Sequence, residues 1–346
     1  MTDRMGGGKV ALITGANAGI GLTLAERLLT IHKDLHLCLA CRNRQRAETA
    51  RKVLLLSHPR SQISIVTLDT SNIQSVLSAI SDIKKQFSRI DYLYLNAGKM
   101  SVKNLNFSNL FKSILKMNTL FLFNTGHGLL VHSDEQTPEG LMSTFATNTF
   151  GHFVLVKELE DILGGTQSSQ IIWTSSVAGV RSAFNPRDIQ ARNGKDPYGS
   201  TKCVIDTTSL VLNEKLKRKN IYSHTTCPGL VLTNMTNGIL ASWIWWLILP
   251  FLYIFRLVLD HLSIDTYRGS ESLVWLSQQE PDCLKTGVRY HSSTDVWGST
   301  TVLPVQVNFT LEESFKVYEE MNNLYKGFKE KYKSLDKCDK RKHLVT

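Results

Sequence analysis

The stretch Thr14-Gly15-Ala16-Asn17-Ala18-Gly19-Ile20-Gly21 decides the fold of this chain. A short apolar run at residues 9–14 leads into it, and a helical pattern with Leu24 and Leu28 on one face follows it. Glycine lets the backbone approach a pyrophosphate closely, and the first turn of a helix offers free N–H groups and the positive end of a dipole. The strand–turn–helix order therefore predicts a dinucleotide-binding turn. The residues expected to contact the dinucleotide in this turn are Gly15, Asn17, Gly19, Ile20 and Gly21.

Strand and helix patterns alternate along the chain after this turn. Apolar runs predict strands at residues 35–40, 63–68, 90–95, 170–174 and 221–226. Helical patterns occupy residues 73–87, 141–163, 198–216 and 271–276, and a further strand is expected near Val288. Strands that alternate with helices at this spacing indicate a parallel sheet. The fold class is therefore α/β, with a Rossmann-type doubly wound sheet in a single domain.

The end of the second strand carries arginines where dinucleotide folds usually have an acid. No aspartate or glutamate occurs between Asp34 and Glu48, whereas Arg42, Arg44 and Arg46 crowd this position. Because arginine can pair with the 2′-phosphate of the adenosine ribose, Arg42 favours NADPH over NADH as the cofactor. The alternative is a basic helix start that only faces solvent.

Other candidate cofactor contacts follow the remaining strands. In open α/β sheets, ligands bind at the carboxyl ends of the strands, so residues that follow successive strands share one edge. A Pro-Gly turn also follows the run at residues 221–226 and lies where a nicotinamide would bind. The candidates from these positions are Asp69, Asn96, Ala97, Gly98, Pro228, Gly229, Val231 and Thr233.

Tyr198 and Lys202 form the pattern Y-x-x-x-K, which is common by chance in helices. Four residues of helical spacing put the phenol and the amine on the same face. A charged lysine nearby would favour the ionised phenol, so that the tyrosine could exchange a proton near neutral pH. A serine at the end of the fifth strand, Ser175 or Ser176, could hold a carbonyl oxygen during that exchange.

Taken together, these motifs resemble the short-chain dehydrogenase/reductase family. The matching elements between residues 10 and 233 are TGANAGIG, the Asp69 turn, NAG at 96–98, Asn148, Ser176, the Tyr198–Lys202 pair and P-G-x-V-x-T. The resemblance implies that Tyr198 protonates the developing alkoxide and that Lys202 lowers the pKa of Tyr198 and holds the nicotinamide ribose. It also implies that Ser176 orients the ketone and that Asn148 anchors a water that relays protons to Lys202. The stretch between Ser176 and Tyr198 is longer than in most members, which leaves Ser175 open as the alternative.

The segments LHLCLACRN, YLNAG, NTFGHF, IIWTSS and ESLVWL further resemble the 3-keto-steroid reductase branch of this family. That resemblance implies NADPH-dependent reduction of the 3-keto group of sterol intermediates in cholesterol synthesis, and extends to the 17-keto group of a steroid such as estrone. It also implies a location at the endoplasmic reticulum membrane with the catalytic domain facing the cytosol. Two alternatives remain, a retinoid or general carbonyl reductase and a non-catalytic, cofactor-binding scaffold for sterol enzymes.

Residues 239–259 form an apolar block with one arginine and one proline. The block is long enough to span a bilayer, but soluble-type sequence follows it, so a hydrophobic hairpin or an in-plane insertion is favoured over a spanning helix. Contact with membrane lipid is expected in either case. The domain is expected to cover residues 1–310, with an insertion at 99–140, and a helix with a basic tail to cover 311–346.

The formal net charge of +10 raises the question of an anionic partner. No nucleic-acid-binding module is recognisable, and no metal site is expected, because alternation points Cys38 and Cys41 to opposite faces of a strand. Members of the resembling family often pair through helices beside the active site. A homodimer or an association with other sterol-synthesis enzymes therefore remains open.

Overall fold

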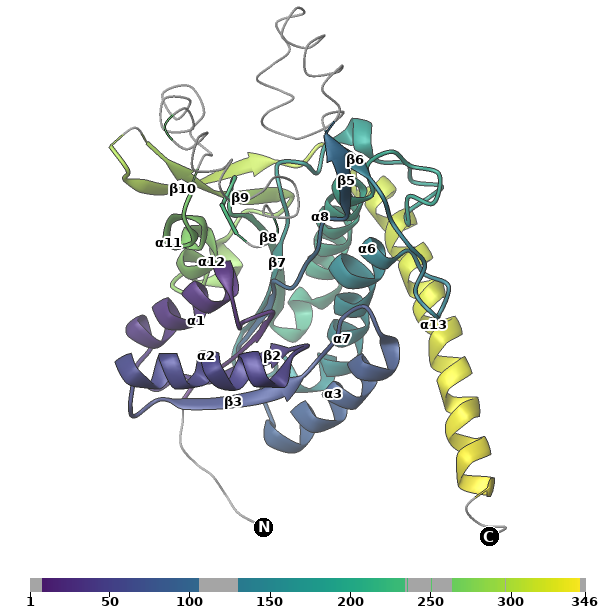
Figure 1. Ribbon diagram of the computed structural model, residues 1–346, viewed down its shortest axis with the longest axis horizontal. Coiled ribbons are helices and arrows are strands. Elements are labelled where there is room, and N and C mark those ends of the chain that lie inside the picture. Colours follow the sequence, from purple (N-terminus) through teal and green to yellow (C-terminus); the bar gives the residue numbers. More distant parts are fainter. Residues whose placement is uncertain are drawn as a thin grey trace, which may run out of the picture.

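The computed structural model describes residues 8–105, 130–233, 235, 250, 263–295 and 297–342. A single eight-stranded sheet forms its centre (Figure 1), in the order β10-β9-β8-β7-β4-β1-β2-β3. The strands are β1 (Val10–Thr14), β2 (His36–Cys41), β3 (Gln62–Thr67), β4 (Tyr92–Leu95), β7 (Ser169–Thr174), β8 (Ile221–Cys227), β9 (Val288–Thr294) and β10 (Thr300–Gln306). Every neighbouring pair is parallel except β9 and β10. The predicted Rossmann-type parallel sheet is confirmed, while the antiparallel edge strand β10 was not predicted.

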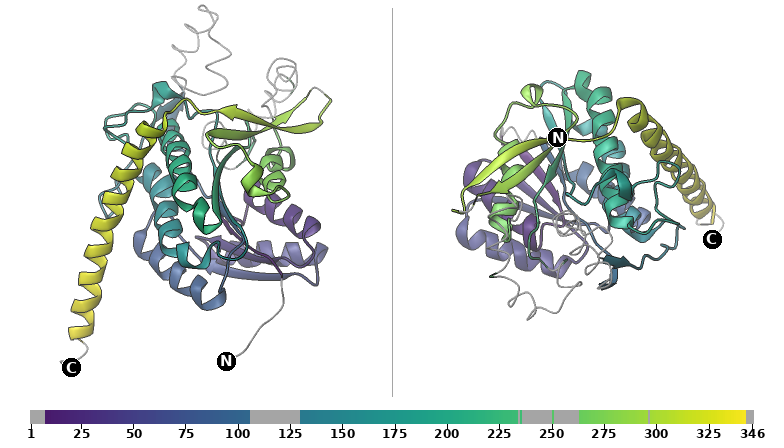
Figure 2. Two further views of the ribbon diagram at one scale, coloured as in Figure 1. Left: turned by 180° about the vertical axis from the view of Figure 1, so that it is seen from behind. Right: turned by 90° about the horizontal axis from the view of Figure 1, so that it is seen from above.

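Helices cover both faces of this sheet (Figures 1 and 2). On one face lie α1 (Gly19–Ile31), α2 (Arg44–Ser57), α11 (Thr266–Gly269) and α12 (Glu271–Leu276). On the other lie α3 (Ile73–Gln86), α6 (Ser143–Phe145), α7 (Gly151–Leu159), α8 (Pro197–Leu216) and α13 (Leu311–Lys342). Alternation along β2 divides its side chains between two apolar cores, with Cys38 in one and Cys41 in the other. Both thiols are buried and free.

The predicted helix at residues 141–163 is one helical segment that changes its pitch. It begins with α6, passes through a π-helical turn at Ala146–Phe150, continues as α7 and ends in a 3₁₀ turn at Glu160–Ile162. Such π turns shift the register of a helix and occur frequently at functional sites. Gly151 then passes very close to the turn after β3, because a Cβ atom on it would lie 2.0 Å from the carbonyl oxygen of Thr70. A glycine is therefore needed where α7 crosses that turn.

Helix α13 packs along the outer side of α7 and α8 (Figure 2). Val317, Tyr318, Met321 and Tyr325 belong to the same buried core as the sheet. The ring of Phe153 on α7 meets Tyr318 and Tyr325 edge-on, with centroid distances of 5.6 and 6.3 Å. The first part of this C-terminal helix thus completes the core of the domain.

The predicted insertion after Gly98 begins and ends in a two-stranded antiparallel ribbon. Strand β5 (Val102–Leu105) pairs with β6 (Leu130–His132), and residues 106–129 lie outside the described part of the chain. His132 Nε2 lies 3.4 Å from Oδ1 of Asp196, the residue that caps α8. The ribbon therefore lies against the helix end that carries Tyr198.

The apolar block at residues 239–259 lies outside the described residues, apart from Pro250. The chain on either side of it is paired, because Leu232 N donates to Ile264 O at 2.9 Å and Ile264 N donates to Leu230 O at 2.8 Å. The described chain before and after these residues is thus held together at one point of the domain. Within the described ranges, no helix is long and apolar enough to cross a membrane.

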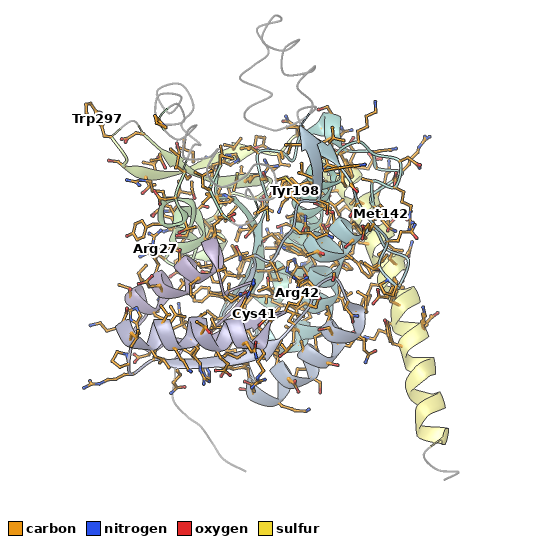
Figure 3. All side chains as sticks on the ribbon, in the orientation of Figure 1. Arg27, Cys41, Arg42, Met142, Tyr198 and Trp297 are labelled. Atoms are coloured by element: carbon orange, nitrogen blue, oxygen red, sulfur yellow. The ribbon has the colours of Figure 1, made fainter. Side chains whose placement is uncertain are left out.

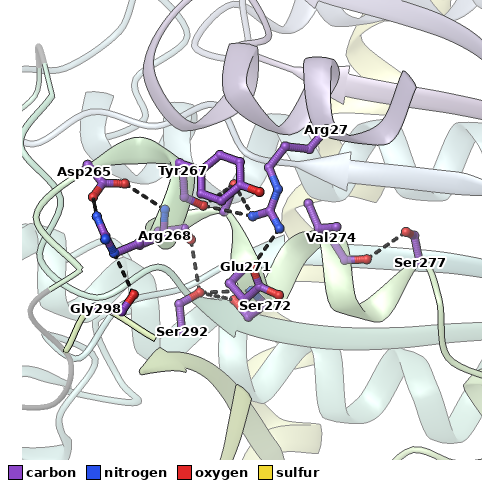
Figure 4. Close-up of polar contacts among 12 residues, drawn as sticks. Arg27, Asp265, Tyr267, Arg268, Glu271, Ser272, Val274, Ser277, Ser292 and Gly298 are labelled. Atoms are coloured by element: carbon purple, nitrogen blue, oxygen red, sulfur yellow. Dashed lines mark hydrogen bonds and ion pairs between the residues drawn. The ribbon is translucent and has the colours of Figure 1, made fainter. Parts of the chain in front are cut away.

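The chain that returns from this segment is fixed against α1 (Figure 4). Arg27 donates to the carbonyl oxygen of Tyr267 at 2.9 Å and to Ser270 Oγ at 3.0 Å, and it forms an ion pair with Glu271 at 2.7 Å. Its guanidinium also lies 4.2 Å from the centroid of the Tyr267 ring. These contacts hold α11 and α12 on the helix that follows the glycine-rich turn.

Candidate active site

The amino end of α1 has the features that a pyrophosphate requires. Gly15 and Gly19 adopt φ angles of +70° and +54°, which favour glycine. Ala18 caps the helix without a side-chain hydrogen bond, and no acidic residue lies in the first turn. The free N–H groups and the helix dipole are therefore available to an anion. The predicted dinucleotide-binding turn fits the cofactor in this respect.

Thr14, the last residue of β1, fixes the turn that follows β4. Its hydroxyl accepts hydrogen bonds from the backbone N–H groups of Asn96 and Ala97, each at 2.9 Å. The side-chain amide of Asn96 (Nδ2) in turn donates to the Thr14 backbone carbonyl oxygen at 3.1 Å. The Asn96-Ala97-Gly98 turn is consequently held beside the glycine-rich turn, and Gly15 would meet Ala97 at 3.1 Å if it carried a Cβ atom.

A buried histidine joins Thr14 to the π turn. His152 Nδ1 lies 3.1 Å from the Asn148 carbonyl oxygen, and its Nε2 lies 3.0 Å from Thr14 Oγ1. Burial lowers the pKa of His152 to about 4, so the ring is neutral at physiological pH. Because the carbonyl can only accept, Nδ1 carries the proton and Nε2 accepts from the Thr14 hydroxyl. Sequence reasoning missed this residue, although it lies one helical turn after Asn148.

The side chain of Asn148 holds the β4 turn against α8. Its Oδ1 accepts from Lys99 N at 2.8 Å, while Nδ2 donates to Lys99 O at 2.9 Å and to Thr201 Oγ1 at 3.2 Å. Three hydrogen bonds therefore hold this amide in place. The water relay from Asn148 to Lys202 stays a prediction.

The predicted tyrosine and lysine lie together near the amino end of α8, where Figure 3 labels Tyr198. Asp196 caps this helix by accepting from Gly199 N at 2.8 Å, and Pro197 begins it. Lys202 Nζ lies 5.1 Å from the centroid of the Tyr198 ring and donates to the Thr174 carbonyl oxygen at 2.8 Å. The lysine thus reaches from α8 to the end of β7.

The pKa of Tyr198 lies above its usual value, and the lowering contribution of Lys202 that the family resemblance implied stays a prediction. Burial raises the pKa of this phenol to about 12, and a hydrogen bond with the Ser176 side chain offsets part of the shift. The Lys202 ammonium lies over the face of the ring and also donates to the Thr174 carbonyl oxygen. Tyr198 is therefore protonated at neutral pH and suited to donate a proton.

The two candidate serines have different surroundings. Ser176 hydrogen-bonds with Tyr198, and its Oγ also accepts from Ala178 N at 3.2 Å. Ser175 is buried, and its Oγ points to the Lys202 carbonyl oxygen at 3.5 Å. Only Ser176 has its hydroxyl beside the phenol, and this geometry favours it as the residue that orients the ketone.

The other predicted cofactor residues gather along the same edge. Asp69 Oδ1 accepts from Ser71 N at 2.9 Å, and Arg42 is exposed immediately after β2 (Figure 3). A Cβ atom on Gly98 would lie 3.4 Å from Asn148 Oδ1, and one on Gly19 would lie 3.5 Å from Thr233 Cγ2. The Pro228-Gly229 turn follows β8, with Gly229 at a φ angle of +73°, and Val231 pairs with Ile264.

A helix end suited to an anion and a half-buried tyrosine that can donate a proton therefore share one edge of the sheet. This combination defines an oxidoreductase in which a nicotinamide dinucleotide supplies the hydride and the protein supplies the proton. The family model described as short chain dehydrogenase matches residues 9–137 and 119–242. The chain belongs to the short-chain dehydrogenase/reductase family.

Two similar proteins match nearly the whole chain. The 3-keto-steroid reductase/17-beta-hydroxysteroid dehydrogenase 7 of Rattus norvegicus is 43% identical over 319 residues, covering 92% of this chain and 96% of its own. The protein of the same name from Homo sapiens is 41% identical, covering 92% and 94%. A crystal structure of an uncharacterized Mycobacterium paratuberculosis protein shares the fold, with a TM-score of 0.62 and 18% identity over 92% of this chain and 93% of that one.

Replacing Tyr198 with phenylalanine should remove the proton donor while keeping the ring. We expect turnover to fall by roughly 10²- to 10⁴-fold, the usual contribution of a general acid. NADPH affinity, measured by fluorescence titration, should stay within about twofold because Lys202 and the glycine-rich turn are untouched. Turnover at the wild-type rate would show that another group donates the proton.

Proposed function

We propose that this enzyme is an NADPH-dependent 3-keto-steroid reductase that acts on sterol intermediates and also on a 17-keto group such as that of estrone. One observation carries the proposal: relatives with this activity in their name are 41% and 43% identical over 92% of the chain. The site is consistent with it, because Ser176, Tyr198 and Lys202 are all present and adjacent. Zymosterone-like ketones are the substrates we expect.

The residues of the site act on the ketone oxygen. When bound, NADPH would supply the hydride that the carbonyl carbon receives. Ser176 would hold the carbonyl oxygen and Tyr198 would give it a proton, so that the ketone becomes an alcohol. Burial lowers the pKa of Lys202 to about 8, so the ammonium carries its charge in most molecules at pH 7. This charge stabilises the phenolate that remains after the transfer.

The preference for NADPH rests on the arginines after β2. Arg42 is exposed at the carboxyl end of that strand, and Arg44 and Arg46 begin the following helix. Asn43 caps this helix by accepting from Arg46 N at 2.9 Å, so no carboxylate occupies this cap. A 2′-phosphate would meet positive charge here, whereas an NADH ribose would lack its usual acidic partner.

Arg42→Ala should therefore lower kcat/KM for NADPH and leave that for NADH nearly unchanged. A hydrogen bond to a charged group contributes about 1.5–3 kcal/mol, which corresponds to roughly 10- to 100-fold. Arg60→Ala is the matched control, because this exposed arginine lies beyond the other end of α2. An equal loss with both cofactors would contradict the assignment of Arg42 to the 2′-phosphate.

Two alternatives concern the substrate and the activity itself. A retinoid or general carbonyl reductase would use the same residues, and a cofactor-binding scaffold for sterol enzymes would turn over no substrate. The full-length protein should consume NADPH fastest with zymosterone-like 3-ketones, more slowly with estrone and least with retinal. The alcohols should be identified by mass spectrometry. Faster reduction of retinal than of every steroid would reject the steroid assignment, and binding without turnover would favour the scaffold.

We also propose that the enzyme lies on the endoplasmic reticulum membrane, facing the cytosol, and contacts lipid through residues 239–259. The paired ends of segment 234–262 support a hairpin or in-plane insertion, since a single crossing would separate them. Trp297, which is 90% exposed, projects from the tip of the β9–β10 hairpin (Figure 3). Tryptophan favours the membrane–water interface, so this tip is a candidate second contact.

Membranes that carry the enzyme should retain it after carbonate extraction at alkaline pH. A protease added to sealed microsomes should cleave an epitope tag at the C-terminus and one at the N-terminus equally. Release by carbonate would contradict deep insertion. Protection of the C-terminal tag alone would instead support a spanning helix.

A further inference from the structure

A buried ion pair lies one helical turn beyond Lys202, outside the residues assigned to catalysis. Asp206 on α8 pairs with Arg289 on β9, and their side chains are 0% and 9% exposed. Arg289 Nε donates to Asp206 Oδ1 at 3.4 Å, and one of its terminal nitrogens donates to Oδ2. Because both charges are removed from water, each depends on the other, and loss of one partner leaves the other uncompensated.

Arg289 also reaches the turn that carries Ser176. It donates to the Gly179 carbonyl oxygen at 3.1 Å, and Gly179 N donates to the Ser176 carbonyl oxygen at 3.0 Å. A Cβ atom on Gly179 would lie 2.8 Å from the guanidinium and 3.0 Å from Lys202 Cβ. One arginine therefore contacts the serine turn and the carboxylate beside the lysine.

Lys202 experiences both charges of the pair. Asp206 favours its protonated form and Arg289 opposes it, while burial is the largest influence and lowers its pKa. The other titratable groups around it are Tyr198 and Cys203 on α8, Cys227 on β8 and His152 on α7. Burial keeps the cysteine thiols and the histidine neutral near pH 7. Asp206 and Arg289 are thus the charged groups among these neighbours.

We propose that Asp206 and Arg289 are positioning residues that keep Lys202 in its catalytic place. Arg289 holds the Asp206 carboxylate, which would otherwise form an ion pair with the ammonium one turn away and draw it from Thr174 and the nicotinamide ribose. Asp206 in turn balances the positive charge of Arg289, which would otherwise repel the ammonium. The Asp206–Arg289 pair thus allows the Lys202 ammonium to stay charged while buried, with its N–H groups available to the cofactor. This inference rests on the assigned roles of Tyr198 and Lys202.

The two single variants should move the titration of Lys202 in opposite directions. In Arg289→Gln the unpaired carboxylate stabilises the ammonium, and in Asp206→Asn the unpaired guanidinium destabilises it. We expect the alkaline limb of the pH profile to rise by about 1 pH unit in Arg289→Gln and to fall by a similar amount in Asp206→Asn. The double variant should return to within a few tenths of a unit of the wild type.

The alkaline limb of the pH profile should be measured in two ways on the full-length enzyme. One is NADPH affinity against pH by fluorescence titration, and the other is kcat/KM for ketone reduction. Arg89→Gln is the matched control, since Arg89 pairs with the buried Asp91 at 2.9 Å and donates to the Gly164 carbonyl oxygen at 2.6 Å, at the opposite edge of the sheet. That variant should lower the melting temperature without moving either limb.

Shifts of the same sign in both single variants, or a lower melting temperature with no shift, would overturn the proposal and leave the pair a purely structural role. The proposal would also be overturned if the NADPH affinity of the wild-type enzyme did not fall at alkaline pH. If no steroid ketone is reduced but the affinity limbs move in opposite directions, the substrate assignment fails and the positioning role stands.

Discussion

The burial of one ammonium group constrains the whole site. Lys202 is only 4% exposed, so its charge must be compensated by fixed protein groups rather than by water. The Thr174 carbonyl oxygen accepts a hydrogen bond from the Lys202 ammonium, and the Tyr198 ring lies over that ammonium. Thr174 belongs to β7 and Tyr198 to α8, so the position of this helix relative to this strand has to be fixed. The network through Thr14, His152 and Asn148 fixes the β4 turn and α8 relative to that register.

The sheet could be predicted from the sequence because each pattern that indicates it lies within a few consecutive residues. Alternation along β2, the glycines after β1 and the helical spacing of Tyr198 and Lys202 each depend on a few consecutive residues. The choice between Ser175 and Ser176 needed the path of the chain after β7, which directs one hydroxyl to α8 backbone and the other to the phenol. The upward shift in the pKa of Tyr198 likewise depends on burial, which spacing along a helix does not reveal.

The missed features depend on contacts between distant residues. His152 connects β1 to the π turn across 138 positions, and Arg289 reaches Asp206 across 83 positions. Strand β10 could be overlooked because it is an exposed edge strand that contains Pro304.

Helix α13 has an amphipathic pattern, but the sequence does not say which surface it covers. It covers the outer side of α7 and α8, so a homodimer formed through those helices would have to displace it.

The paired ends of segment 234–262 have a consequence for how such an enzyme can vary. Leu230, Leu232 and Ile264 close this stretch with two backbone hydrogen bonds, and strands β5 and β6 close residues 106–129 in a similar way. When the ends of a loop are already joined, doubling its length adds only about 0.6 kcal/mol of closure entropy. Both stretches can therefore gain, lose or exchange residues with little effect on the stability of the sheet.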